Sequence, residues 1–172
     1  MDYHPENRVR YLLLNNLSNE LMQLNYWAPH VTVAAIIHRD GKFLLVEEKD
    51  KVSGKLVINQ PAGHLENNES LIDAVVRETL EETCWDFEPK YISGIYRWIH
   101  DHGETYLRIC FVGDAIKEHI ELKLDTGIER AIWLTESEVR GHLKLRSPLV
   151  LKSMEDYLAG KAFPLDLIQD IV

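Results

Sequence analysis

The chain has 172 residues, of which 45% are hydrophobic and 27% are charged, a balance typical of one globular domain with a sizeable core. Its formal net charge of −9 argues against broad binding to nucleic acid or to anionic membranes, because both attract basic surfaces. No apolar stretch reaches the roughly 20 residues that span a bilayer. The N-terminus, which carries Asp2 and Glu6, lacks the apolar region of a signal peptide. We therefore expect a cytoplasmic protein with neither nucleic acid nor a membrane as partner.

Apolar residues recur at helical spacing near the start of the chain, between residues 6 and 24. They are Val9, Leu12, Leu13, Leu17, Leu21 and Leu24. This spacing predicts an amphipathic N-terminal helix, and Pro29 closes the segment. The apolar face of such a helix packs on its own domain or on a second chain, so a monomer and a homodimer both remain open.

A β-hairpin is predicted after this helix. Residues 31–38 and 42–47 are rich in strand-forming side chains, and the Asp40-Gly41 pair between them is a strong turn signal. The polar residues 48–55 that follow predict a mobile loop.

An acidic helix is predicted in the middle of the chain, after a turn-rich approach that contains Pro61 and Gly63. Ser70 is a candidate N-cap, with Asp73 as an imperfect capping-box partner three residues later. The buried stripe would consist of Leu71, Ile72, Val75, Val76 and Leu80.

Three carboxylates crowd the end of this helix. Because residues three and four apart share a helix face, Glu78 lies beside both Glu81 and Glu82. The like-charged pair Glu78 and Glu82 costs roughly 0.2–0.5 kcal/mol in an isolated helix. A hard divalent cation such as Mg²⁺ would turn that repulsion into attraction. The alternative is an ordinary solvated acidic face. The sequence thus proposes metal-assisted chemistry on phosphate.

The C-terminal half of the chain predicts a second strand pair, a single strand and two helices. The strands are predicted at residues 91–99, 105–112 and 130–134, and the helices at residues 135–138 onward and 147–158. His100 and His102 fall in the turn at residues 100–104, where a plain turn is favoured over a substrate contact or a second metal site. Cys84 and Cys110 form no CxxC pair, so we interpret both as reduced and buried.

The acidic helix and its approach carry a resemblance to a known family. The matching residues are Gly63, Glu69, Arg77, Glu78, Glu81 and Glu82, which have the spacing of the Nudix box. Cys84 stands where the box closes with Gly, and Thr79 stands at a more often aliphatic position. Residues 30–34, 60–66 and 145–150 make the chain most similar, within the Nudix hydrolases, to the phosphatase NudJ type. Since the resemblance begins near residue 29, we divide the chain into a helical extension, residues 1–28, and a Nudix hydrolase domain, residues 29–172.

The resemblance implies an α/β/α sandwich with a mixed β-sheet, to which the N-terminal helix is an addition. It also implies a site that holds Mg²⁺ or, in its place, Mn²⁺. The implied ligands are Glu78, Glu81, Glu82 and the carbonyl of Ala62, with Glu78 alternatively the base that accepts a proton from water. Arg77 would orient the carboxylates, while Gly63 and Glu69 would be structural.

Further site residues are less well defined by the sequence. Arg108 and Arg146 are candidates for binding substrate phosphates, and each is as readily a structural ion-pair partner. The resemblance also implies a remote acidic residue that completes the metal site, but Gly127 stands in its place, which leaves Asp125 and Glu129 as weak substitutes. The candidates for stacking a substrate ring are Trp27, Tyr96 and Trp98, although such aromatics are more often core residues.

The resemblance to the NudJ type implies a preference for releasing terminal phosphate from simple di- and triphosphates. The implied substrates are nucleoside tri- and diphosphates and hydroxymethylpyrimidine diphosphate. Two alternatives remain: a pyrophosphatase that cleaves dinucleoside polyphosphates or nucleotide sugars, and a non-catalytic nucleotide-binding regulator. The intact Glu78, Glu81 and Glu82 argue against the regulator.

Overall fold

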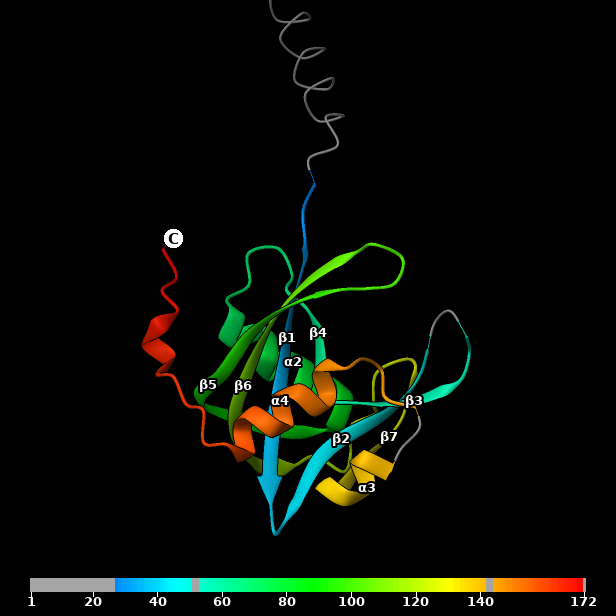
Figure 1. Ribbon diagram of the computed structural model, residues 1–172. Helices are drawn as coiled ribbons and strands as arrows, with labels where there is room; N and C mark the ends of the chain where they lie inside the picture. Colours follow the sequence, from blue (N-terminus) through cyan, green and yellow to red (C-terminus); the bar gives the residue numbers. More distant parts are fainter. Residues whose placement is uncertain (1–26, 51–52, 142–143, 172) are drawn as a thin grey trace, which may run out of the picture.

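The computed structural model describes residues 27–50, 53–141 and 144–171. The helix predicted at residues 6–24 therefore lies outside the described residues. The described chain forms one seven-stranded sheet with helices on both faces (Figure 1). This is the α/β/α sandwich that the resemblance implies.

The predicted first hairpin is confirmed. Strands β1 (His30–Arg39) and β2 (Lys42–Lys49) are joined at Asp40 and Gly41, which both have positive φ angles, 52° and 76°. Such angles suit the tight turn that matches strand twist. Strands β3 (Leu56–Asn59) and β7 (Ile128–Thr135) pair with β2.

The loop predicted at residues 48–55 starts too early. Glu48 and Lys49 continue β2, because their backbones pair with Val57 and Leu56 of β3. The polar side chains of these two residues suggested a loop, but strand pairing depends on neighbouring strands that a local sequence pattern does not include. This difference matters because it fixes the position of Glu48.

Strand β1 lies at the centre of the sheet. It runs parallel to β6 (Thr105–Glu118) and antiparallel to the short β4 (Ala62–His64), and β6 pairs with the edge strand β5 (Trp85–Ile99). The parallel β1–β6 pair makes the sheet mixed, as predicted.

The second strand pair is longer than predicted at both outer ends. Strand β5 begins at Trp85 instead of residue 91, and β6 continues to Glu118 instead of residue 112. Register shifts on both sides of Pro89 allow the ribbon to continue past this residue. The predicted turn at residues 100–104 is confirmed by a 2.8 Å hydrogen bond from the amide of His100 to the carbonyl of Glu104.

The acidic helix α2 (Leu71–Thr83) has the predicted N-cap, since Ser70 Oγ accepts a hydrogen bond of 3.0 Å from the amide of Asp73. Cys84 ends the helix in the left-handed conformation, with φ at 59°, so it performs the exit that Gly performs in the box. The other helices are α3 (Glu136–Gly141), α4 (Leu149–Leu158) and the 3₁₀ helix η1 (Leu165–Leu167).

Two apolar clusters hold the layers together. One lies between the sheet and α3 and α4, and the other lies between the sheet and α2 (Figure 1). Cys84 and Cys110 are buried and unpaired, as predicted. Within the described ranges, no helix has the length and apolar character needed to span a membrane.

Candidate active site

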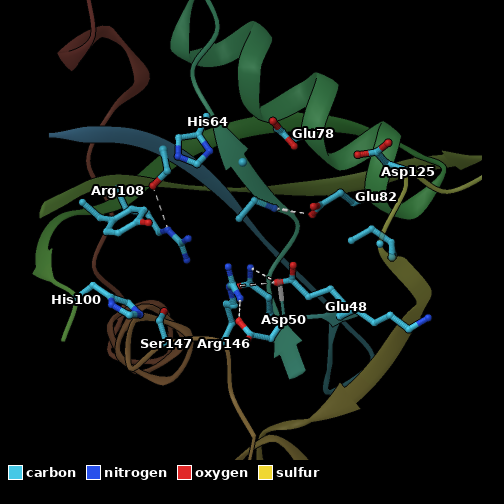
Figure 2. A pocket seen from close by; sticks show the side chains of 18 of the residues that line it. Glu48, Asp50, His64, Glu78, Glu82, His100, Arg108, Asp125, Arg146 and Ser147 are labelled. Carbon is cyan, nitrogen blue, oxygen red and sulfur yellow. Dashed lines mark hydrogen bonds and ion pairs between the residues drawn. The ribbon is translucent and has the colours of Figure 1, made fainter. Parts of the chain in front are cut away.

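A cavity of about 440 Å³ opens beside the acidic helix (Figure 2). Its walls come from the end of β2, from β4 and α2, from the β5–β6 turn and from the segment before α4. One site is therefore surrounded by Gly63, Glu78 and Glu82 of the Nudix box, by residues 48–50 and by the turn at residues 100–104. The other box residues, Glu69, Arg77 and Glu81, are not among the wall residues. Among the sequence-predicted residues, the walls include Ala62, Gly63, Glu78, Glu82, Trp98, Arg108, Asp125 and Arg146.

Gly63 is where strand β4 meets helix α2. A Cβ atom at this position would overlap the carboxyl carbon and both carboxyl oxygens of Glu78. The glycine therefore allows the Glu78 carboxylate to lie directly against the backbone of β4. This contact is the physical reason for glycine at the start of the box.

Arg77 connects the acidic side chains of the box. Its guanidinium donates hydrogen bonds to Glu69 at 2.7 and 2.9 Å, to Glu78 at 2.8 Å, to Glu81 at 3.0 Å and to the carbonyl of His64 at 3.1 Å. Chiefly because of the hydrogen bond to Glu69, the pKa of Arg77 is raised. Orienting the carboxylates thus stays the predicted role of Arg77, and bracing the loop stays that of Glu69.

Glu82 is the most buried carboxylate of the box, with 9% of its surface exposed. Its Oε2 accepts a hydrogen bond of 2.9 Å from the amide of Ala62. Burial and the nearby charges of Glu48, Glu78 and Asp125 raise the pKa of Glu82 to about 8 despite that hydrogen bond. Burial also raises the pKa of Glu78.

These residues suit a hard divalent cation by the chemistry of their donors. They offer carboxylate oxygens, and the pKa values of Glu78 and Glu82 are raised mainly because burial disfavours their charged forms, a cost that a bound cation would offset. In an extended strand the N–H and C=O of one residue point to the same side, so the carbonyl of Ala62 faces α2 as its amide does. In the described part of the chain no three acidic, histidine or cysteine side chains form a ready ligand cluster, and Arg77 forms ion pairs with both Glu78 and Glu81.

Comparison with known proteins identifies the family. Residues 28–154 match the NUDIX domain. This chain belongs to the Nudix hydrolase family. The hydrolase is 39% identical to the phosphatase NudJ of Escherichia coli K12 and to that of Shigella flexneri, over 142 residues that cover 83% of this chain and 92% of each relative.

Solved structures agree with that assignment. A NUDIX hydrolase from Nitrosomonas europaea superposes with a TM-score of 0.81 at 48% sequence identity, covering 84% of this Nudix hydrolase and 98% of that chain. The MutT protein of Methanosarcina mazei, at 22% identity and a TM-score of 0.64 over 79% of this chain and 98% of its own, shares the fold. The NudJ similarity supports hydrolysis of phosphate or pyrophosphate compounds in general.

The structure of this Nudix hydrolase adds an acidic residue that the sequence analysis missed. Glu48, at the end of β2, lines the cavity and contributes to the raised pKa of Glu82. Asn59 donates to it a hydrogen bond of 2.9 Å, and Arg146 lies 3.9 Å away. The available signal was an acidic pair, Glu47-Glu48, directly after four apolar residues of a strand.

The two substitutes for the remote acid separate in the structure. Asp125 lines the cavity, and its amide donates a hydrogen bond of 2.8 Å to the carbonyl of Glu81. Glu129 is not among the wall residues and instead forms an ion pair of 2.5 Å with Lys49. Of the two, only Asp125 is in position to act on a bound substrate.

Of the three aromatic residues predicted to stack a substrate ring, one lies at the cavity. Trp98 lines the cavity and packs on Tyr106 with ring centroids 5.5 Å apart. Tyr96 instead packs against the core, and its hydroxyl donates a hydrogen bond of 3.0 Å to Asp156, so its prediction as a ring platform is wrong. Trp27 is 73% exposed and is not among the wall residues, so it is not a platform either.

The cavity walls carry buried polar atoms without a partner among the described residues. They are Asn59 Oδ1, Arg108 Nη1 and Ser147 Oγ. Buried polar groups in proteins are nearly always hydrogen-bonded, so these three atoms mark where a ligand is to be expected.

Proposed function

We propose that this Nudix hydrolase releases terminal phosphate from nucleoside tri- and diphosphates and from small diphosphates such as hydroxymethylpyrimidine diphosphate. One observation carries the proposal: carboxylates and two arginines, Arg108 and Arg146, face the same cavity from different walls. A polyphosphate chain needs such a combination, because part of its charge is neutralised by a metal and the rest by protein cations. Similarity to NudJ phosphatases supports the choice of substrates.

The proposed metal ligands are Glu78, Glu81, Glu82 and the carbonyl of Ala62, with Mg²⁺ as the ion and Mn²⁺ as a substitute. A bound divalent cation neutralises phosphate charge and lowers the pKa of water. Arg77 fixes the carboxylates through its hydrogen bonds to Glu78 and Glu81.

The remaining roles belong to residues of the cavity walls. Glu78 lies against Gly63 at the cavity wall, where it is available as a ligand or as the acceptor of a proton from water. Asp125 and Glu48 would add negative charge near the metal. Trp98 would pack against a planar ring of the substrate.

The test is release of inorganic phosphate by the purified full chain, with Mg²⁺ and then with a chelator. The substrates are nucleoside triphosphates, nucleoside diphosphates, hydroxymethylpyrimidine diphosphate and a dinucleoside polyphosphate. Metal-dependent phosphate release from the first three is expected. Two phosphorylated fragments from the dinucleoside compound alone would instead indicate a pyrophosphatase, and nucleotide binding without turnover would indicate a regulator.

We also propose a cytoplasmic location and a small-molecule substrate as the binding partner. The negative net charge supports this proposal, since it disfavours nucleic acid as a partner. The choice between monomer and homodimer is to be made by gel filtration with light scattering.

A further inference from the structure

Arg108 is a buried cation that forms no ion pair within the described residues, although the charges of Glu48 and Glu82 reach it through space. It is 8% exposed, its Nε donates a hydrogen bond of 3.4 Å to Thr32 Oγ1, and its Nη1 has no partner in the part of the chain that the structure describes. No carboxylate of the described residues forms an ion pair with it. A charge buried in this way is costly for the fold, which indicates that the anion it matches comes from outside the chain.

Arg146 lines the same cavity but has its own counter-ions. It forms an ion pair with Asp50, lies 3.9 Å from Glu48, and keeps a third of its side chain exposed. The protein thus compensates the charge of Arg146 internally. Of the two arginines, Arg108 is the one that has no such ion pair among the described residues.

Ser147, on the wall of the same cavity, provides a second polar group without a partner among the described residues. Its side chain is buried, with 6% of the residue exposed, and Oγ has no hydrogen-bond partner among the described residues. Figure 2 shows the guanidinium of Arg108 pointing into the cavity, on the side where Ser147 and Arg146 lie. A hydroxyl and a guanidinium that face one space are both donors suited to an oxyanion.

The strand register makes this end of the cavity blind. On one face of the sheet, Arg108 stands in a row with Thr32 of β1 and Tyr96 of β5. The next row toward the core contains Ala34 and Cys110, which are both 0% exposed. The cavity therefore ends at the guanidinium, and only the terminal group of a ligand fits there.

The row on the other side of Arg108 consists of rings. It contains His30, Tyr106 and Trp98, with ring centroids of neighbours 4.9 and 5.5 Å apart. Rows on one face of a sheet are separated by two residues, about 7 Å. A ligand whose terminal anion reaches Arg108 therefore passes this aromatic row.

We propose that Arg108 and Ser147 form an oxyanion subsite that binds the terminal phosphate of the substrate, apart from the carboxylates that would hold the metal. The inference rests on the proposed function and deepens it, because a blind subsite selects compounds with a free phosphate end. Dinucleoside polyphosphates and nucleotide sugars, whose phosphates are substituted at both ends, lack the group that fits.

The experiment measures binding of inorganic phosphate to the full chain by calorimetry in the presence of a chelator. Wild type should bind phosphate, Arg108→Met should lose at least about tenfold in affinity, and Ser147→Ala should lose about three- to tenfold, the loss expected for a typical single hydrogen bond. Arg97→Gln is the matched control. It removes an exposed guanidinium from the opposite face of β5 and should leave the affinity unchanged.

A second measurement separates a binding role from a structural one. If Arg108 serves a ligand, Arg108→Met should melt at the same temperature as wild type or higher, because it removes an unpaired buried charge. If Arg108→Met fails to fold, the three- to tenfold loss in Ser147→Ala decides in favour of the subsite, and unchanged affinity there overturns it.

Each of the remaining possible outcomes would overturn the proposal. Absence of phosphate binding by wild type, or equal binding by wild type and both variants, overturns the subsite. A nucleoside without phosphate serves as the second probe, and its binding with loss in Arg108→Met would overturn the proposal by showing that Arg108 contacts the base. Because these measurements need no metal and no turnover, they fail independently of the phosphate-release assay.

Discussion

Glu82 is a single residue whose surroundings disfavour its charged form. Its carboxylate is nearly buried and accepts a hydrogen bond from the amide of Ala62, while Glu48, Glu78 and Asp125 lie near it. Burial among like charges favours the protonated form. The site therefore carries a cost in stability that a divalent cation can reverse, which is the usual exchange of stability for function.

We expect Glu82→Gln to reduce turnover by at least about 100-fold, because a metal-binding carboxylate is removed from a site where charge stabilisation dominates the rate. The amide oxygen of Gln can still accept the hydrogen bond from Ala62, so the variant should fold. The measurement is kcat for phosphate release together with the melting temperature. Glu118→Gln, on the exposed end of β6, is the control. Near-wild-type turnover would contradict the ligand assignment.

Metal affinity should depend on pH through the same residue. The pKa of Glu82 is raised from 4.5 to about 8 in the metal-free protein, mainly by burial, so a cation must displace a proton at neutral pH. Affinity for Mg²⁺ should therefore rise by up to about tenfold per pH unit between pH 6 and 7 and level off above about pH 8. Stability without metal should change in the opposite direction and fall between about pH 4.5 and 8, because the folded state holds the additional proton. Titration calorimetry and thermal melts test both trends, and Glu82→Gln should lack them.

At the scale of elements, the site depends on how closely α2 approaches β4. The box residues of the two elements meet where Gly63 leaves space for the Glu78 carboxylate, and Arg77 ties α2 to the carbonyl of His64. Strand β4 has only three residues, and its position is set by its pairing with β1 and by its contact with α2. This is why strand β4 has no clear pattern in the sequence.

Gly63→Ala should therefore disable the enzyme. The added methyl must displace the Glu78 carboxylate, and we expect kcat/KM to fall by at least about tenfold with a loss of stability of about 1–3 kcal/mol from overpacking. Gly141→Ala is the control, because a Cβ there meets open space. Kinetics and denaturant unfolding of both variants provide the test, and similar behaviour of the two would refute the contact.

Asp156 anchors α4 to the rest of the fold. Although burial opposes its charge, hydrogen bonds from Lys152 at 2.7 Å, Lys161 at 2.9 Å and Tyr96 at 3.0 Å keep its pKa at about 2, below the ordinary 3.8. At about 1.4 kcal/mol per pH unit, this lowering is worth about 2 kcal/mol.

Asp156→Asn should lower the free energy of unfolding by about 2 kcal/mol at neutral pH. Since the folded pKa is the lower one, the stabilisation in wild type is complete above about pH 4 and is lost as the pH falls toward 2. Unfolding measured between pH 2 and 7 should show this loss in wild type and a flatter curve in the variant. Parallel curves for the two proteins would show that the carboxylate does not carry the effect.

For the molecule as a whole, the core is built from the matched family region. Both apolar clusters draw on β1 at the centre of the sheet, and helices cover them on the two faces (Figure 1). The clusters therefore connect the cavity walls from β2, β4, β6, α2 and the segment before α4 into one body. Such a core is expected to fold without the N-terminal segment.

A chain that lacks residues 1–26 should consequently melt within a few degrees of the full chain and keep its phosphate-release activity. This result would support the proposed division at residue 28. The same pair of proteins in gel filtration with light scattering should show whether the predicted helix joins two chains. A large loss of stability in the shortened chain would mean that the segment belongs to the domain.

The sequence by itself determined the local features of this protein. Helix α2 with its Ser70 cap, the hairpin at Asp40 and Gly41, and the spacing of Glu78, Glu81 and Glu82 follow from short-range rules, because each depends on residues within a few positions. The tertiary structure alone decided which distant residues meet. It brought Glu48 near Glu82 and left Arg108 without an ion pair among the described residues, since strand pairing and burial depend on contacts between residues far apart in the chain.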